Sequence, residues 1–220
     1  MQHDLKTTIP EVRINFSYLL YGCESPVLDR HVNGGKDTLA SPSHYKELTR
    51  SYRAAWERYE TILLRDMQTI LGVAFYRPVI DVSLAPYFVP HSDPLIINFR
   101  YEPDEFVDIL THELLHVLLT DNSVHQSNSR QPKMNLLQEW RSLFGDHANL
   151  VLAHIPVHAL HKSLCLHTLK APERLERDVS RAQQSPTGAV YAEAWDYVNT
   201  HDYLGIIDQL RLIYRDTSSK

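Results

Sequence analysis

The chain has 220 residues and a formal net charge of −5, with 43% hydrophobic and 22% charged residues. This composition is typical of a globular protein and excludes an intrinsically disordered chain. The negative charge argues against a nucleic-acid partner, because a phosphate-binding surface needs an excess of basic residues. The sequence contains no run of 18 apolar residues, so we expect no membrane-embedded segment.

A single domain is expected over residues 1–220, because no stretch rich in proline, glycine and serine divides the chain. The two cysteines, Cys23 and Cys165, are far apart and belong to no CxxC pattern. They therefore indicate neither a disulfide framework nor a thiolate zinc site. The N-terminal residues also lack the pattern of a secretory signal, so we expect a cytoplasmic protein.

The first predicted element is a half-buried strand over residues 11–20, in which apolar and polar side chains alternate. A loop is expected from there to about residue 40. Ser41 and Pro42 then have the residue types of a helix N-cap and a first helical position. Apolar residues recur at intervals of three and four from this point to about Gly72, which predicts one long helix.

Two strands are predicted between residues 73 and 100, separated by a proline-rich loop. The first, residues 73–85, contains Pro78, which cannot donate a hydrogen bond to a neighbouring strand. We therefore expect an edge strand or a bulge there. The second strand is residues 94–100, and Pro103 follows it as the expected first residue of a helix.

This helix contains the pentapeptide HELLH, formed by His112, Glu113, the two leucines and His116. Two histidines four residues apart lie on one face of a helix, so both can bind the same zinc ion. Glu113 then stands beside the ion, where it can accept a proton from a water molecule. The alternative is an ordinary buried helix with two histidines at its edge.

The pentapeptide and the elements before it resemble the N-terminal half of the zincins, a group of zinc-dependent peptidases, over residues 42–120. The resemblance implies an α+β fold, mainly helical, with a small twisted sheet before the HExxH helix. It also implies Zn²⁺ as the cofactor, Glu113 as the general base and a peptide or protein as the substrate. In such proteins the strand before the active helix is often a sheet edge that binds an extended substrate, here residues 94–100 or a neighbour.

Two narrower groups with this motif do not fit the sequence. The metzincin pattern HExxHxxGxxH requires glycine and histidine where this chain has Leu119 and Asn122. Peptide deformylases use an upstream cysteine ligand, but Cys23 is almost ninety residues before the motif. The resemblance therefore extends to the zincin group and to no named subfamily.

The third zinc ligand is expected downstream, because catalytic zinc takes three protein ligands and leaves one position open. His154, His158 and His161 are spaced at i, i+4 and i+7, on one face of a predicted helix. We expect His154, ahead of His158, to be the ligand, with His158 orienting a ligand of the site and His161 as the least favoured of the three. Pro156 complicates the choice, because a helix beginning there would leave His154 just outside it.

Glu193 is the alternative third ligand, because a glutamate on a later helix would give the His₂Glu set of other zinc enzymes. The simpler interpretation is a carboxylate on the surface of that helix, predicted at 188–198. Tyr191 in the same helix could stabilise a developing oxyanion or could pack in the core. Other helices are predicted at 133–145, 172–184 and 205–216.

These patterns together predict a zinc-dependent hydrolase, most simply a metallopeptidase, with His112, His116 and His154 or His158 as metal ligands. The second hypothesis is a zincin-like domain that binds zinc without catalysis and acts as a binding or regulatory module. The sequence names neither the substrate nor the oligomeric state.

Overall fold

The computed structural model describes residues 9–21, 40–86, 88–126, 132–184 and 188–216. The protein has a mainly helical α+β fold, with a small mixed four-stranded sheet before helix α4, as predicted. The predicted loop before residue 40, with Cys23, lies outside the described residues apart from its two ends. Within the described part, no helix has the length and apolar character needed to cross a membrane.

The chain forms two compact units. The first, which we call the sheet unit, comprises residues 10–61 and 77–114, and the second, which we call the helical unit, comprises residues 1–9, 62–76 and 115–220. Helix α4 (Pro103–Gln126) contributes residues to both units.

The sheet unit contains a sheet with the strand order β1-β2-β4-β3. The two pairs β1–β2 and β2–β4 are parallel, whereas β3 and β4 are antiparallel. The predicted alternation is confirmed in β1, where Ile14 is buried and Arg13 and Asn15 are exposed. The predicted extent, residues 11–20, is wrong at its end, because the strand stops at Phe16 and a helix begins at Tyr18. The strands are β1 (Glu11–Phe16), β2 (Val79–Leu84), β3 (His91–Ser92) and β4 (Leu95–Ile97).

The prediction of an edge strand or a bulge at Pro78 is wrong. Strand β2 begins at Val79, immediately after the proline, and lies between β1 and β4. Pro78 is therefore outside the ladder of β2, and its carbonyl accepts a hydrogen bond from the Glu11 N–H at 3.0 Å. The missing N–H of the proline costs the sheet nothing, because proline is tolerated just before a strand.

Of the two positions predicted for the edge strand, residues 94–100 or a neighbour, the structure places the neighbour β3 at the edge. The strand within residues 94–100, β4, pairs with β2 on one side and with β3 on the other. Its neighbour β3 is the last strand of the order on that side. The antiparallel β3–β4 hairpin supplies this extra pairing, and its two-residue β3 was too short to show periodicity in the sequence.

The long helix predicted from Ser41 is two helices, α2 (Pro42–Glu57) and α3 (Glu60–Leu71). Its start is confirmed, because the Ser41 side chain accepts a hydrogen bond from the His44 N–H. The break follows Glu57, where the Tyr59 N–H donates to the carbonyl of Trp56 at 2.8 Å. Neither glycine nor proline marks the break, and the apolar spacing continues across it.

Stacked aromatic rings in the sheet unit support the start of α4. Tyr52 of α2 is fully buried, and its ring is stacked 4.3 Å from that of Phe106. Its hydroxyl donates to the carbonyl of Tyr101, just before the helix. The Glu105 carboxylate accepts a hydrogen bond from the Glu102 N–H at 3.2 Å, as in a capping box.

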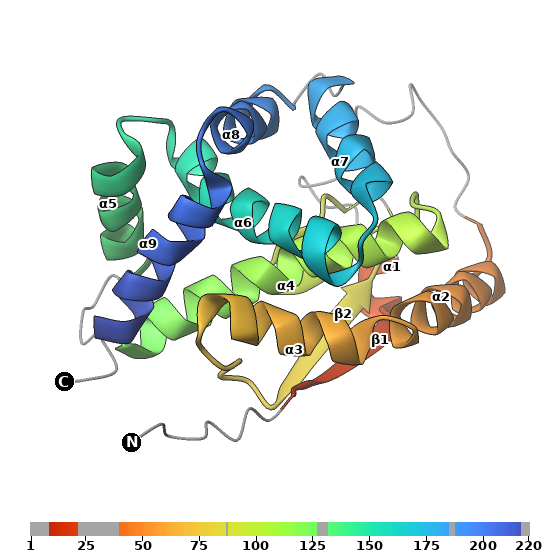
Figure 1. Ribbon diagram of the computed structural model, residues 1–220. Coiled ribbons are helices and arrows are strands. Elements are labelled where there is room, and N and C mark those ends of the chain that lie inside the picture. Colours follow the sequence, from red (N-terminus) through yellow and green to blue (C-terminus); the bar gives the residue numbers. More distant parts are fainter. Residues whose placement is uncertain (1–8, 22–39, 87, 127–131, 185–187, 217–220) are drawn as a thin grey trace. The chain divides into compact units, whose positions relative to one another are not determined.

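The helical unit is organised around α6 (Asn149–Ser163), which packs against α5, α8 and α9 (Figure 1). The predicted downstream helices are confirmed with small shifts at their ends. A short helix, α1 (Tyr18–Tyr21), follows β1, and a π-helical turn, Leu164–Thr168, follows α6. The remaining helices are α5 (Pro132–Phe144), α7 (Pro172–Gln184), α8 (Ala189–Thr200) and α9 (Tyr203–Asp216).

Pro156 lies inside α6 and does not begin it. A proline within a helix costs about 3 kcal/mol, because it removes one hydrogen bond and crowds the preceding turn. Helix α6 is buried along most of its length, so packing against three neighbouring helices offsets this cost. As a result His154 and His158 both belong to the same helix.

Candidate metal centre

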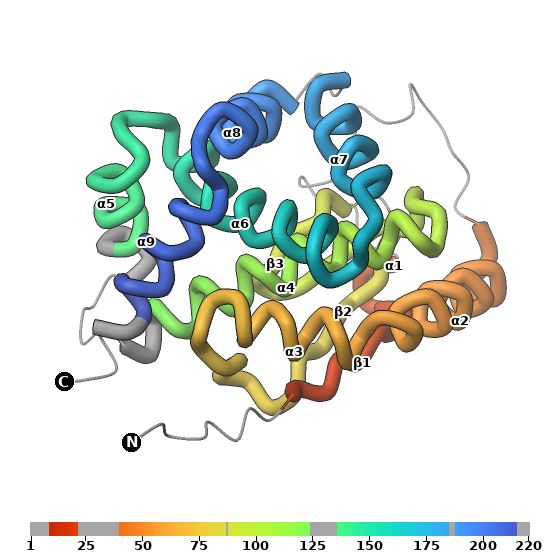
Figure 2. The backbone as a smooth tube through the Cα atoms, in the orientation of Figure 1, coloured from red at the N-terminus to blue at the C-terminus, as the bar shows by residue number. Residues whose placement is uncertain are grey.

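Helix α4 carries HELLH in one uninterrupted run of helical backbone (Figure 2). His112 and His116 are therefore one turn apart on the same face, at a spacing that the helix itself fixes. Both imidazoles are half-buried, whereas Glu113 between them is buried, with an exposed fraction of 6%. The helix thus has the ligand spacing that the sequence predicted.

The closest partner of this motif on α6 is His154. Its Nε2 lies 3.4 Å from Nε2 of His116, and the two rings are nearly perpendicular, at 78°. This separation is long for a nitrogen hydrogen bond, which is usually 2.7–3.2 Å. Two nitrogens that each lie about 2.0–2.1 Å from one tetrahedral zinc ion are about 3.3–3.4 Å apart. The pair therefore has the spacing of two ligands of the same ion.

The second ring nitrogen of His154 fixes the tautomer. Nδ1 lies 2.7 Å from the carbonyl oxygen of Leu150, one turn earlier in α6. A carbonyl only accepts, so Nδ1 carries the proton and donates it to this bond. Nε2 is left with its lone pair directed at His116, as metal-binding histidines require.

His112 completes a group of three imidazoles that could hold a metal ion, together with His116 and His154. Its place in the group follows from its position one turn before His116 on α4. Three nitrogen ligands suit zinc, and they leave a fourth tetrahedral position for water or substrate.

Burial keeps the imidazoles neutral. Burial, and to a smaller extent the nearby His154, lower the pKa of His116 to about 3. Burial also lowers the pKa of His154, although its hydrogen bond to Leu150 works in the opposite direction. Both rings therefore present lone pairs at neutral pH, which is the state that binds metal ions.

Burial shifts the pKa of Glu113 in the opposite direction, upward. Burial raises the pKa of its carboxyl group to about 8, because the charged form loses its hydration. Without a cation nearby the group is therefore mostly protonated at neutral pH. A divalent cation beside it would lower this pKa and favour the carboxylate, which is the form that acts as a base.

His158 has a different environment from His154. Its ring is stacked on that of Trp195 in α8, with centroids 4.1 Å apart and planes at 10°. It is 1% exposed, and its centroid lies 5.5 Å from that of His154. Among the residues that the structure describes, the candidate ligand groups include His154 but not His158. The geometry therefore favours His154 as the third ligand.

His161 lies a further turn along α6 and faces helix α7. Its Nδ1 is 3.6 Å from one carboxylate oxygen of Asp178, and the other oxygen of this carboxylate accepts a hydrogen bond from Arg181 at 3.4 Å. The sequence analysis did not single out Asp178. The available signal was weak, because this acid belongs to a strongly charged surface helix and differs little from its neighbours.

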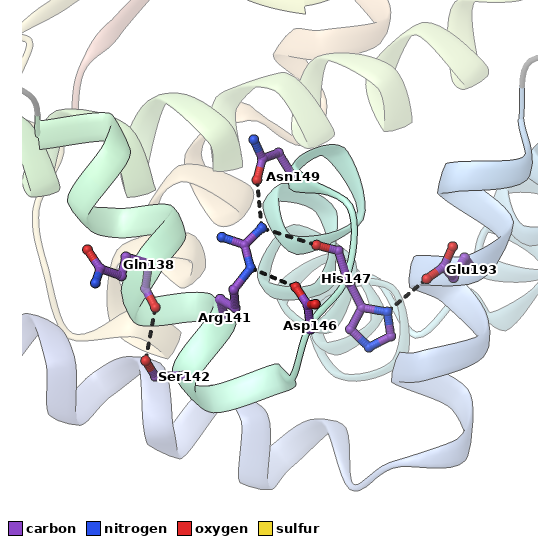
Figure 3. A network of polar contacts seen from close by, with 7 residues as sticks. All are labelled: Gln138, Arg141, Ser142, Asp146, His147, Asn149 and Glu193. Carbon is purple, nitrogen blue, oxygen red and sulfur yellow. Dashed lines mark hydrogen bonds and ion pairs between the residues drawn. The ribbon is translucent and has the colours of Figure 1, made fainter.

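Glu193, the alternative ligand, is exposed and takes part in a separate polar network (Figure 3). Its carboxylate lies 2.8 Å from Nδ1 of His147, just before α6. Arg141 of α5 completes the network with hydrogen bonds to Asp146, to the His147 carbonyl and to Asn149. These contacts tie together α5, the start of α6 and α8, so they give Glu193 a structural role at the surface.

Two aromatic residues of α8 face the histidines of α6. The ring of Tyr191 lies edge-on to His154, with centroids 4.5 Å apart, and Trp195 covers His158 one turn later. Both pairs are spaced at i and i+4 on their helices, so one face of α8 covers the histidine face of α6. Tyr191 is half-buried.

The chain was compared with models of known protein families, with curated protein sequences and with solved structures, and no match was found. The class of protein therefore has to be inferred from the residues themselves.

Proposed function

We propose that this protein is a zinc-dependent hydrolase of the zincin type, most simply a metallopeptidase. The observation that supports this best is the 3.4 Å separation of the His116 and His154 Nε2 atoms, which suits two ligands of one tetrahedral ion. These two residues are 38 positions apart in the chain, so helical periodicity alone does not bring them together.

Each residue of the candidate centre has a distinct role in this proposal. His112, His116 and His154 hold the ion through neutral imidazole nitrogens, and Leu150 orients His154 through its carbonyl. A bound zinc ion would supply Lewis-acid activation of water and of the substrate carbonyl. Glu113, ionised next to the ion, accepts the proton of the attacking water and passes it to the leaving amine.

The number of ligands supports a catalytic centre over a purely structural one. Structural zinc sites are usually closed by four protein ligands, whereas catalytic sites use three. Within the described part of the chain, one candidate group joins three histidines, His112, His116 and His154, and a second joins His112 to His161 and Asp178, so each group offers three ligands.

Metal analysis tests the centre directly. Purified protein from zinc-supplemented growth should contain about one zinc per chain, and His116→Ala should abolish binding. His201→Ala is the matched control, because this exposed histidine lies in the turn after α8. Metal-free wild-type protein under these conditions would contradict the proposal.

Hydrolysis is tested separately, with casein and a mixed peptide library as substrates. Glu113→Gln should retain zinc and lose the activity, because glutamine cannot accept the proton. If zinc-loaded wild-type protein cleaves neither substrate class, the binding-module hypothesis gains support. If Glu113→Gln cleaves them as well as the wild type does, Glu113 is not the general base.

A further inference from the structure

A carboxylate that the proposed mechanism does not use lies close to the candidate centre. It belongs to Asp178 of helix α7, and one polar atom each of Asp178, His161 and His112 lie within 4.8 Å of one another. His112 is also a member of the three-histidine group, so its ring adjoins both groups. An acidic side chain therefore stands near a proposed zinc ligand.

The Asp178 carboxylate is held firmly at one of its two oxygens. Its side chain is 15% exposed, and Oδ1 accepts a hydrogen bond from Arg181, three residues later in α7, at 3.4 Å. Its Oδ2 lies 3.6 Å from Nδ1 of His161, beyond the usual 2.7–3.2 Å of a hydrogen bond. Among the described residues no hydrogen bond to Oδ2 is formed. Oxygens with this little access to solvent normally accept one, so Oδ2 can take a further donor.

A zinc-bound His112 would supply such a donor. A neutral imidazole binds the ion through one nitrogen and carries a proton on the other. Metal-binding histidines almost always donate this proton to a carboxylate, a backbone carbonyl or water, which fixes the ring and makes the ligand more basic. For His154 the acceptor is the Leu150 carbonyl. For His112 the carboxylate of the same group is that of Asp178.

The other interpretation of this group is a second metal ion. A neutral imidazole has one lone pair, so His112 cannot bind two ions at once. With His112 committed to the first ion, only His161 and Asp178 remain, which is fewer than the three or four protein ligands of zinc sites. Arg181 also places a positive charge beside the carboxylate, and this charge disfavours a second cation there. A hydrogen bond to His112 therefore fits the group better.

We propose that Asp178 is a positioning residue of the metal centre, whose carboxylate accepts the proton of the His112 ring nitrogen that does not bind the ion. This inference rests on the proposed zinc centre and adds an outer partner to it. The hydrogen bond holds His112 in the tautomer and ring orientation that the ion requires. The negative charge of Asp178 strengthens the bond and favours the bound cation. Asp178 contacts neither the water nor the substrate, so its effect on hydrolysis acts through the ion.

The ring N–H protons of the histidines test this hydrogen bond directly, by NMR of the zinc-loaded full-length protein. The wild type should show slowly exchanging ring N–H signals from His112 and His154, because hydrogen-bonded protons are protected from exchange with water. Asp178→Ala should lose the His112 signal and keep that of His154, whose proton is held by Leu150. If Asp178 only stabilised α7, the His112 signal would remain.

Zinc affinity, measured by competition with a chromophoric chelator, is the second readout. Asp178→Ala should bind zinc up to about a hundredfold more weakly than the wild type. Asp178→Asn has the same shape and should lose about tenfold, because its amide oxygen still accepts a hydrogen bond but carries no charge. It also carries the test if the alanine variant does not fold. Glu176→Gln is the matched control, since Glu176 is an exposed acid of the same helix, and it should bind as the wild type does.

The possible outcomes separate this proposal from the zinc centre on which it rests. A His112 signal that persists in Asp178→Ala, or unchanged zinc affinity in both Asp178 variants, would overturn it. A second zinc ion in the wild type that is lost in Asp178→Asn would overturn it as well, because the carboxylate would then be a ligand. A wild-type protein that binds no zinc would instead refute the proposed centre, and this inference with it.

Discussion

The Nε2 atoms of His116 and His154 face each other at 3.4 Å, and the opposite nitrogen of His154 is held by the Leu150 carbonyl. One turn along the same helix, His158 is instead stacked on Trp195. His154 and His158, the two candidates on α6 for the third ligand, thus have different surroundings. Their replacement should therefore change the zinc affinity by different amounts.

Zinc binding should depend on His154 and tolerate replacement of His158. His154→Phe removes a ligand, so we expect zinc affinity to fall by more than about a hundredfold, beyond the loss typical of residues that only orient a ligand. His158→Phe keeps a ring stacked on Trp195 and should change affinity by about tenfold or less. Competition with a chromophoric chelator measures both constants. The reverse order of the two variants would assign the ligand to His158.

The elements that support this centre differ in how far the sequence predicted them. Ser41 and Pro103 start their helices as expected, because caps and first-turn prolines act through local geometry. The break after Glu57 was not predicted, since its neighbours Arg58 and Tyr59 are ordinary helix residues.

The sequence favoured His154 over His158 only narrowly, for a similar reason. The choice depends on where α6 begins, and Pro156 suggested a start seven residues too late. The packing of α6 against its neighbours overrides that local signal. The HELLH spacing, in contrast, is a property of a single helix, so the relation between His112 and His116 was predictable from the sequence alone.

The stability of the zinc-free protein should reach a maximum near pH 6.5. The folded-state pKa of His116 is about 3, and burial also lowers the pKa of His154 and His158. Below about pH 6.5 the unfolded chain therefore binds protons that these buried rings do not bind, and the free energy of unfolding falls.

Glu113 has the opposite effect on how the free energy of unfolding changes with pH. Its folded-state pKa of about 8 lies above the ordinary value of 4.5, so its contribution is complete below pH 4.5 and is lost as the pH rises through 8. Between pH 4.5 and 6.5 the lowered pKa values of the histidines oppose the effect of Glu113, whereas above pH 6.5, among these four groups, the raised pKa of Glu113 determines the change in stability. Urea unfolding at a series of pH values measures the curve. Glu113→Gln should remove the decline above pH 6.5 and retain the acid limb; an unchanged alkaline limb would contradict this account.

Tyr52 should contribute strongly to the stability of the sheet unit. Tyr52→Phe keeps the stack on Phe106 but leaves the Tyr101 carbonyl without its hydroxyl donor, so we expect a loss of about 1–2 kcal/mol. Tyr52→Ala also creates a cavity in the core and should cost about 3–5 kcal/mol. Chemical denaturation gives both values. Equal losses would show that the hydroxyl, and not the ring, supplies the stability.

Removal of zinc should lower the melting temperature. A ligand that binds only the folded state stabilises it by about 2.7 kcal/mol at a hundredfold excess over its Kd. For a chain of this length that corresponds to a shift of about 5–10 °C. Differential scanning calorimetry before and after dialysis against a chelator measures it, with re-addition of zinc to show that the loss is reversible. His116→Ala should melt at the same temperature with and without zinc, because it lacks the ligand that connects α4 to His154. If zinc raises the melting temperature of this variant as much as that of the wild type, the ion binds elsewhere in the protein.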